Sequence, residues 1–311
     1  MDTTLNPKRV VILGASGFLG SAMTKHLADA GHEVTAYWRQ PNSELAKHSN
    51  VRSVIADLRD TWILADVIAD VDVVYHFASA THPSLFYSNP SAEYWEALQP
   101  LLVMLETAVR GNVGKIVYPS SGGTIYADSP VARTEDSQTD PKSPYAIFKL
   151  AAERLLLHAV RLGQIQVDIF RVGNPYGPGQ RTRPGQGVLP HWIDAIQNKQ
   201  PIKVFGDGSA ERDYIYIDDL CRLMSISCQR PDESDVFNLG TGKATSLAEL
   251  VQGLKTHLSH DQPVEHVAGR AVDIQSIALN TSRLLELVPG FEFTPLAEGL
   301  RRTLAHHGLG Q

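Results

Sequence analysis

The first informative feature of this 311-residue chain is its shortage of cysteine. The two cysteines, Cys221 and Cys228, lie seven residues apart in one predicted helix, too far along its axis for a disulfide. The chain has no Cys-x-x-Cys pair and no Cys/His set with metal-ligand spacing. These absences argue against a disulfide framework or a zinc site, and we expect a reducing, cytoplasmic compartment and no metal.

Long apolar runs and runs of one charge are missing as well. No apolar run approaches about 18 residues, and the polar N-terminus breaks at Pro7, so we expect neither a membrane span nor a secretory signal. The formal net charge of −6 is spread along the chain, which predicts no nucleic-acid or anionic-membrane partner. With 43% hydrophobic residues, the composition is that of an ordinary globular protein of one large or two ordinary domains.

A glycine-rich turn between a predicted strand and a predicted helix is the first motif that the chain does contain. Residues 9–13 are continuously apolar, which is typical of a parallel strand covered on both faces. The turn that follows has G-x-x-G-x-x-G spacing and includes Gly14, Gly17, Phe18, Leu19 and Gly20. Glycines let the backbone approach a pyrophosphate, and a helix N-terminus supplies N–H donors. We predict a dinucleotide site here, the plain alternative being a tight turn.

The ends of the next strands bear on the choice of cofactor. A site for NAD usually places Asp or Glu after the second strand, to bind the ribose 2′-hydroxyl. This chain has Trp38-Arg39 at the end of the second strand, which is predicted over 33–38. Two roles fit Arg39: it binds a 2′-phosphate, which favours NADP(H), or it stacks on the adenine or stays solvated. Asp57, after the third strand, either accepts from the adenine amino group or caps the helix that starts near Thr61.

Tyr145 and Lys149 open a helix that is predicted over 143–162. Ser143 suits the N-cap and Pro144 suits the first turn. Residues i and i+4 share one helix face, and a lysine ammonium near a phenol lowers the tyrosine pKa from its usual value of about 10. Such a tyrosine is a base usable near neutral pH. The alternative is an ordinary helix on which the two side chains happen to be neighbours.

The order of elements predicts a Rossmann-type, doubly wound α/β fold with a smaller, loop-rich C-terminal domain. Further strands of the sheet are expected at 51–55, 71–77, 115–118 and 166–170, with a long helix over 91–110. Beyond residue 174 we expect helices near 188–198, 218–228, 246–258 and 295–307, and strands near 202–205, 213–217 and 236–239. We predict an NAD(P)-binding domain at 1–173, with a return of about 213–242, and a substrate domain at 174–212 and 243–311.

With these residues in place, the chain resembles the extended short-chain dehydrogenase/reductase family. Within that family it is most similar to nucleotide-sugar epimerases of the UDP-glucose 4-epimerase type. The resemblance covers nearly the whole chain and rests on motifs at 14–20, 120–126, 145–149, 174–180, 206–208, 212–219 and 238–242. It implies bound NAD or NADP, a nucleotide-diphosphate sugar as substrate, and a homodimer that pairs the 91–110 and 143–162 helices.

The resemblance also implies a role for individual residues. Tyr145 would be the base, Lys149 would keep it ionised and bind the nicotinamide ribose, and Ser121, or else Thr124, would donate to the sugar oxygen. Further contacts to the cofactor are implied for Leu58, Phe77, Ala78 and Ser79. Contacts to the nucleotide sugar are implied for Asn174, Val188, Leu189, Phe205, Arg212, Arg270, Asp273 and Ile277. The alternatives are surface ion pairs for the two arginines and a core position for Ile277.

Departures from the family pattern leave two functions open. Leu98 stands where relatives have asparagine, and Thr81 where many epimerases have lysine. Gly122 stands where many relatives carry the hydroxyl of the Ser/Thr, Tyr and Lys triad that the resemblance implies. The leading hypothesis is a UDP-hexose 4-epimerase, and the second is an NADPH-dependent reductase of a nucleotide-linked 4-keto-6-deoxy sugar, which Arg39 favours. Gly122-Gly123 argues against a 4,6-dehydratase, which carries Asp-Glu there, and the loop lacks the cysteine of a 3,5-epimerase. The complete triad argues against a catalytically silent NADP-binding regulator.

Overall fold

Seven parallel strands form the main sheet, in the order β10-β6-β5-β4-β1-β2-β3. The computed structural model describes residues 6–79, 91, 94–129, 131–182, 187–268 and 276–310. The strands are β1 (Arg9–Leu13), β2 (Glu33–Trp38), β3 (Val51–Ile55), β4 (Val73–His76), β5 (Lys115–Ser121), β6 (Gln166–Val172) and β10 (Asp235–Leu239). The strand order reverses between β1 and β4, so the predicted doubly wound sheet is confirmed.

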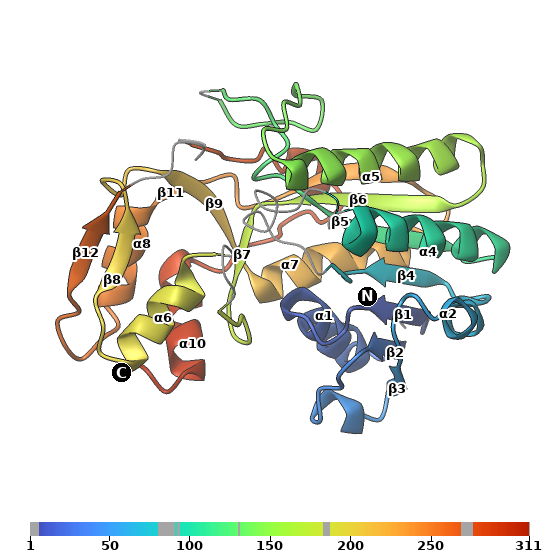
Figure 1. The fold of residues 1–311 in the computed structure, drawn as a ribbon, viewed down its shortest axis with the longest axis horizontal. Helices are drawn as coiled ribbons and strands as arrows, with labels where there is room; N and C mark the ends of the chain where they lie inside the picture. The colour runs from blue at the N-terminus through green and yellow to red at the C-terminus, as the bar shows by residue number, and fades with distance from the viewer. Residues whose placement is uncertain are drawn as a thin grey trace.

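Helices cover both faces of this sheet (Figure 1). One face carries α1 (Phe18–Asp29) and α7 (Ile217–Met224), and the other carries α2 (Thr61–Ile68), α4 (Gln99–Arg110) and α5 (Pro144–Arg161). In β1, Val10 and Ile12 join the first of these apolar layers, and Val11 and Leu13 join the second. This alternation explains why the strand reads as a continuous apolar run. Among the described residues, no helix is long and apolar enough to span a bilayer.

A smaller second lobe follows the sixth strand of the sheet and lies at the left of Figure 1. Its helices are α6 (Leu189–Gln197), α8 (Leu247–Lys255) and α10 (Leu296–His306), whereas the short α9 (Ser282–Leu285) packs on β10 of the main sheet. Its strands are β7 (Asn174–Tyr176), β8 (Ile202–Phe205), β9 (Glu211–Tyr216), β11 (Ala244–Ser246) and β12 (Val264–Val267), in two small sheets ordered β11-β9-β7 and β12-β8. Of the expected return to the first domain, β10 joins the main sheet and α7 packs on α1, whereas β9 pairs within the second lobe.

Several element boundaries differ from the predicted ones, four of them for identifiable reasons. The strands β5 and β6 continue to Ser121 and Val172, because they remain paired with each other along that length. The helix expected over 218–228 ends at Met224 and continues as a 3-10 turn, Ser225–Gln229. The regular part of the 91–110 helix starts only at Gln99, after a π-helical turn, because Pro100 fits a first helical turn but not a helix interior.

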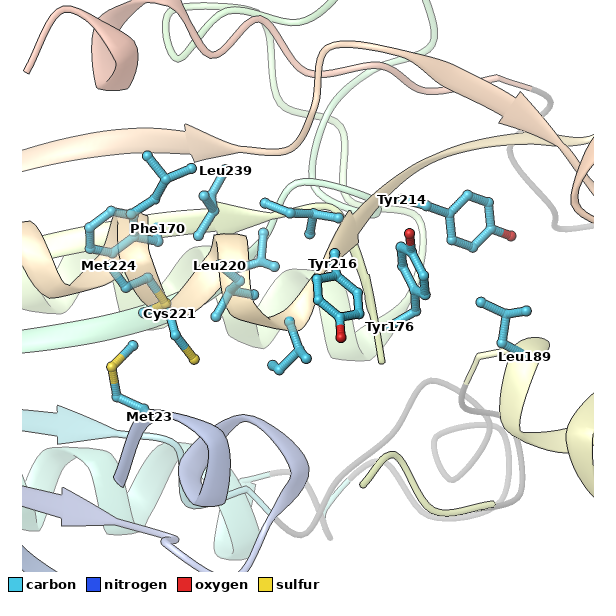
Figure 2. Packing of buried hydrophobic residues seen from close by; sticks show 14 of the residues in the cluster. Met23, Phe170, Tyr176, Leu189, Tyr214, Tyr216, Leu220, Cys221, Met224 and Leu239 are labelled. Carbon is cyan, nitrogen blue, oxygen red and sulfur yellow. The ribbon is translucent and has the colours of Figure 1, made fainter. Parts of the chain in front are cut away.

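One apolar core joins the two lobes (Figure 2). It runs from Met23 on α1, through α7 and the end of the main sheet, to Tyr176, Tyr214 and Leu189 in the second lobe. The ring of Tyr176 meets the ring of Tyr214 edge to face, with centroids 6.3 Å apart. A Cβ atom on Gly299 of α10 would lie 2.2 Å from Tyr176 Oη, so any larger residue there would have to displace the Tyr176 ring. The second lobe is therefore packed firmly against the carboxyl ends of the sheet strands.

Candidate active site

The start of α5 places Tyr145 and Lys149 beside the end of β5. Ser143 Oγ accepts from the backbone N–H of Ala146 at 3.2 Å, so the predicted N-cap is confirmed. Lys149 Nζ donates to the Pro119 carbonyl at 2.8 Å and lies 5.9 Å from the centroid of the Tyr145 ring. Both side chains are half-buried. The ammonium is thus held close to the phenol by the backbone of β5.

Two hydroxyl groups lie at the end of β5 and in the turn that follows it. Thr124 Oγ1 donates to Ser121 Oγ at 2.8 Å, so the two candidate donors form a pair. A Cβ atom on Gly122 would lie 2.6 Å from Leu279 Cδ1 and 2.8 Å from the Arg171 carbonyl oxygen. The turn therefore has no room for a side chain at residue 122. Ser121 and Thr124 therefore provide the hydroxyl groups that could donate a hydrogen bond to a substrate here.

The turn between β1 and α1 is shaped to receive a phosphate group. Gly14 has φ +83°, and a Cβ atom on it would lie 2.6 Å from the backbone nitrogen of Ala78. A Cβ atom on Gly20 would lie 2.3 Å from the Gly14 carbonyl oxygen, so backbone packs directly on backbone here. Gly17 is the N-cap of α1, and the first helical turn carries no acidic side chain. Backbone N–H donors and a helix N-terminus without a competing carboxylate fit a dinucleotide pyrophosphate.

The residues expected around the adenosine lie at the ends of β2 and β3. Arg39 is exposed directly after β2, whereas Trp38 is buried in the core. Asp57 accepts from Arg59 Nε at 2.8 Å and from the Arg59 backbone at 3.0 Å, and these bonds lower the pKa of Asp57 to about 2. The N-cap position of α2 is held by Asp60, not by Asp57. This corrects the helix-cap alternative for Asp57 and leaves its carboxylate, with half-buried Leu58 beside it, at the sheet edge.

The end of β4 contributes a site residue that the sequence pattern did not single out. His76 is 4% exposed and stacks on Tyr118 with ring centroids 6.2 Å apart. Burial, and to a smaller extent the positive charge of Lys149, lower the pKa of His76 to about 3. The imidazole is therefore neutral at physiological pH. A histidine at the end of an otherwise apolar strand was the signal in the sequence that could have identified it.

A small cavity lies between His76, the π-helical turn and α5. Its volume is about 30 Å³. Its lining includes His76, Phe77, Ala78, Ser79, Leu98, Tyr145 and Lys149. The strand-end residues that were expected beside the cofactor thus share one cavity wall with the two residues of the proposed catalytic pair.

A buried polar network fixes α5 to the sheet and to the 122–140 loop. Arg171 of β6 forms an ion pair with Glu153 of α5, with Nη2 2.8 Å from Oε2. Arg171 Nη1 also donates to Tyr126 Oη at 2.9 Å, and Tyr126 Oη donates to Asn238 Oδ1 at 2.6 Å. The network connects β6, α5, β10 and the loop after Ser121. It fixes the position of α5, which carries Tyr145, relative to the segment that contains Ser121 and Thr124.

The residues expected to bind the nucleotide sugar are distributed over the second lobe. Asn174 lies next to the hydroxyl turn, because its Oδ1 is 3.4 Å from the position of a Cβ atom on Gly123. Val188 is the N-cap of α6, and Leu189 is its first residue, with a buried side chain. Phe205 ends β8 and Arg212 lies on β9, and both are half-buried. Of these residues, the structure brings Asn174 to the candidate active site.

Three expected substrate contacts have a different outcome. Arg270 and Asp273 lie outside the described residues. Ile277 is only 2% exposed and belongs to an apolar cluster with Ile125, Tyr126, Ala146 and Leu279. The expectation that Ile277 borders the sugar is corrected, because its side chain is a core residue. An apolar side chain after a loop fits both readings, so the sequence alone did not separate them.

The comparisons with known proteins agree with this geometry. The model of the NAD dependent epimerase/dehydratase family matches residues 10–240. A UDP-glucose 4-epimerase from Mycolicibacterium smegmatis is 29% identical over 306 residues, which cover 95% of this chain and 97% of that protein. A dTDP-4-dehydro-6-deoxy-D-allose reductase from Streptomyces bikiniensis is 30% identical over 319 residues, with 96% and 97% covered.

The fold agrees with the same group of proteins. The structure of UDP-glucose 4-epimerase from Thermotoga maritima, solved with UDP-glucose, has a TM-score of 0.88 and 26% identity, and 96% of this chain and 98% of that chain are covered. The family model covers well over half of the chain, and the triad geometry and the glycine turn lie within that part. The chain therefore belongs to the NAD-dependent epimerase/dehydratase family of nicotinamide-dependent nucleotide-sugar enzymes, in the extended short-chain dehydrogenase/reductase group.

Proposed function

We propose that this protein is a nucleotide-sugar 4-epimerase of the UDP-hexose type, which inverts the sugar at C4 by reversible hydride transfer. The observation that carries the proposal is the grouping of Tyr145, Lys149 and the Ser121–Thr124 hydroxyl pair at the end of β5. The same sheet edge carries the glycine turn before α1. The similarity to UDP-glucose 4-epimerases over nearly the full chain supports this chemistry.

The proposed mechanism assigns one task to each residue. Lys149 favours the phenolate form of Tyr145, because a nearby positive charge stabilises the ionised phenol. Tyr145 takes the proton from the sugar 4-hydroxyl and later returns it. Ser121 donates a hydrogen bond to the sugar oxygen while Thr124 donates to Ser121. A bound nicotinamide ring would supply the acceptor, and then the donor, for the hydride of sugar C4. The hydride must return to the opposite sugar face, so the 4-keto sugar has to turn within the site.

The remaining site residues would hold the cofactor and the nucleotide. For the cofactor these are Gly14, Gly17, Phe18, Leu19 and Gly20 at the pyrophosphate, Arg39, Asp57 and Leu58 at the adenosine, and Phe77, Ala78 and Ser79 with Lys149 towards the nicotinamide. For the nucleotide sugar they are Asn174, Val188, Leu189, Phe205, Arg212, Arg270 and Asp273. Arginine suits the diphosphate because its planar guanidinium offers a fork of donors.

One observation favours a second function, reduction of a nucleotide-linked 4-keto-6-deoxy sugar by NADPH. Arg39 is exposed directly after β2, where it could meet a 2′-phosphate, and the Asp57 carboxylate after β3 is already hydrogen-bonded to Arg59. A reductase that acts on a dTDP-linked keto sugar is among the relatives. In this reaction the same triad would work in one direction only, with Tyr145 as the proton donor.

The cofactor of freshly purified protein distinguishes the two functions. An epimerase is expected to release NAD on denaturation and to interconvert UDP-glucose and UDP-galactose without added cofactor. A reductase is expected to bind NADPH and to oxidise it only when a nucleotide-linked 4-keto sugar is present. Arg39→Ala should then weaken NADP(H) binding about tenfold more than NAD(H) binding, the worth of one charge-assisted contact. If the protein binds cofactor but shows neither of these activities, both assignments are contradicted.

We also propose that the protein acts as a homodimer through α4 and α5. Trp95, in the π-helical turn before α4, is 62% exposed, and Ile147 of the neighbouring α5 is 51% exposed. Exposed large apolar side chains on adjacent helices are typical of a subunit interface. Sedimentation at micromolar concentration should give the dimer mass, and Ile147→Glu should shift it towards the monomer. A monomer mass for the wild-type protein would contradict this proposal.

A further inference from the structure

A buried nitrogen atom beside Lys149 has no hydrogen-bond partner in the part of the chain that the structure describes. This atom, His76 Nδ1, has less than 1 Å² of accessible surface. Leaving a buried polar atom unpaired costs about 1–3 kcal/mol, so native proteins rarely retain such an atom without a reason. Phenylalanine would keep the stacking on Tyr118 without this cost. The presence of histidine at this position therefore needs an explanation.

The adjoining cavity provides a partner of the right size. A water molecule needs about 10–15 Å³ of probe-occupied volume and two or more polar neighbours, and this cavity offers about 30 Å³. Polar groups on its wall come from β4, from the Ser79 segment and from α5, where Tyr145 and Lys149 lie. Ala97 and Leu98 of the π-helical turn form its apolar side. The cavity is large enough for one or two water molecules and has polar atoms to bind them.

We propose that this cavity holds an ordered water molecule that accepts a hydrogen bond from the Lys149 ammonium and donates one to His76 Nδ1. His76 is then a positioning residue: it acts on Lys149 through the water, and through Lys149 on the ionisation of Tyr145. The inference deepens the proposed function and rests on the assignment of Tyr145 as the base. It gives the unpaired nitrogen a partner and gives one donor of Lys149 a fixed direction in addition to the Pro119 carbonyl.

The charges around His76 suit this role. The titratable groups that face it are Lys149 and Tyr145 from α5 and Tyr118 from β5, while the π-helical turn presents apolar Ala97 and Leu98. A neutral imidazole that carries its proton on Nε2 accepts at Nδ1. It therefore orients the water without adding a second positive charge beside Tyr145. Lys149 remains the one cation, among the described groups, that lines this cavity.

The ultraviolet absorbance of the Tyr145 phenolate tests the inference without any substrate. The titration curve of Tyr145 is the absorbance titration of each protein minus that of the same protein with the additional substitution Tyr145→Phe. In His76→Phe, which keeps the ring but removes both nitrogens, we expect the pKa of Tyr145 to rise by about one unit, a tenfold loss of phenolate at a given pH. His76→Gln, which retains a polar acceptor, should recover much of this shift. Thermal unfolding checks that each variant is folded.

A second variant removes the water and leaves the imidazole in place. Ala97→Val narrows the cavity from its apolar side and should raise the pKa of Tyr145 in the same direction as His76→Phe. This variant also decides the question if His76→Phe does not fold. An unchanged Tyr145 titration in the folded variants would overturn the role of His76 and leave the proposed function standing. A wild-type protein in which Tyr145 titrates near its ordinary pKa of about 10 would overturn both.

Discussion

Two buried polar clusters at the carboxyl edge of the main sheet differ in how completely their polar atoms are hydrogen-bonded. Around Arg171, the Glu153 carboxylate, the Tyr126 hydroxyl and the Asn238 amide are hydrogen-bonded to one another or to backbone. Around Lys149, His76 Nδ1 and Ser120 Oγ are buried and have no hydrogen-bond partner among the described residues. Satisfied networks rigidify a fold, and unsatisfied groups are kept where something else must bind. The contrast separates the residues that hold the site together, around Arg171, from the residues around Lys149 that have polar atoms left to bind water or ligand.

A third group, Asp213 of β9, follows the pattern of the satisfied cluster. Its carboxylate accepts from the backbone N–H groups of Thr241, Gly242 and Leu279 and from the Thr241 hydroxyl, at 2.7–3.0 Å. A Cβ atom on Gly240 would lie 2.5 Å from this carboxylate. Asp213 thus joins the loop after β10 to the second lobe, directly beside Arg212. Its role is to fix the junction, and its neighbour is the residue that we propose to bind substrate.

The largest expected effect comes from breaking the satisfied cluster. Glu153→Gln leaves the Arg171 guanidinium buried without a countercharge, which should cost about 3–5 kcal/mol of the free energy of unfolding. Urea denaturation measures this loss. The matched control is Glu298→Gln on α10, where Glu298 pairs with Arg301 at 2.8 Å in partly exposed surroundings, and the expected loss there is much smaller because solvent screens the pair. Equal costs for the two variants would show that the buried network is not a structural anchor.

The second-largest effect is expected from Tyr145, in the cluster around Lys149. Tyr145→Phe removes one hydroxyl group and almost no volume, so stability and cofactor binding should be retained. Turnover should fall at least about 100-fold, the usual scale for a general acid–base group. Steady-state kinetics and thermal unfolding of the same samples check both statements. Activity within a few-fold of wild type would remove Tyr145 from the role of base.

The third effect is a loss in the free energy of unfolding at acidic pH, which arises because His76 is buried in its neutral form. The pKa of His76 is about 3 in the folded protein and about 6.5 in the unfolded chain, so between these values the unfolded chain binds a proton that the folded protein does not. This group therefore lowers the free energy of unfolding by about 1.4 kcal/mol for each pH unit below about 6.5. His76→Phe should remove that contribution and become more stable than wild type as the pH falls. Parallel stability curves for the two proteins, from denaturation at several pH values, would contradict it.

The comparison also shows which parts of the molecule were predictable. The doubly wound sheet, the N-cap at Ser143 and the pairing of Tyr145 with Lys149 followed from local patterns, because glycine spacing, capping and the i, i+4 relation act over a few residues. The place of Ile277 and the unpaired state of His76 depend on which distant segments pack around them. The crowding at Gly122 arises from Leu279, more than 150 residues away, and no local pattern reports such a contact.

The smallest effect separates the two hydroxyls of the turn. If Thr124 acts by donating to Ser121, then Thr124→Val, which keeps the shape, should lower kcat only about 2–10-fold, the worth of one net hydrogen bond. Ser121→Ala should cost more, because it removes the group that meets the sugar oxygen. Thr124→Ser retains a hydroxyl and should restore most of the loss, with KM unchanged throughout. If Thr124→Val costs as much as Ser121→Ala or more, Thr124 is itself the donor to the substrate and the order of the pair is reversed.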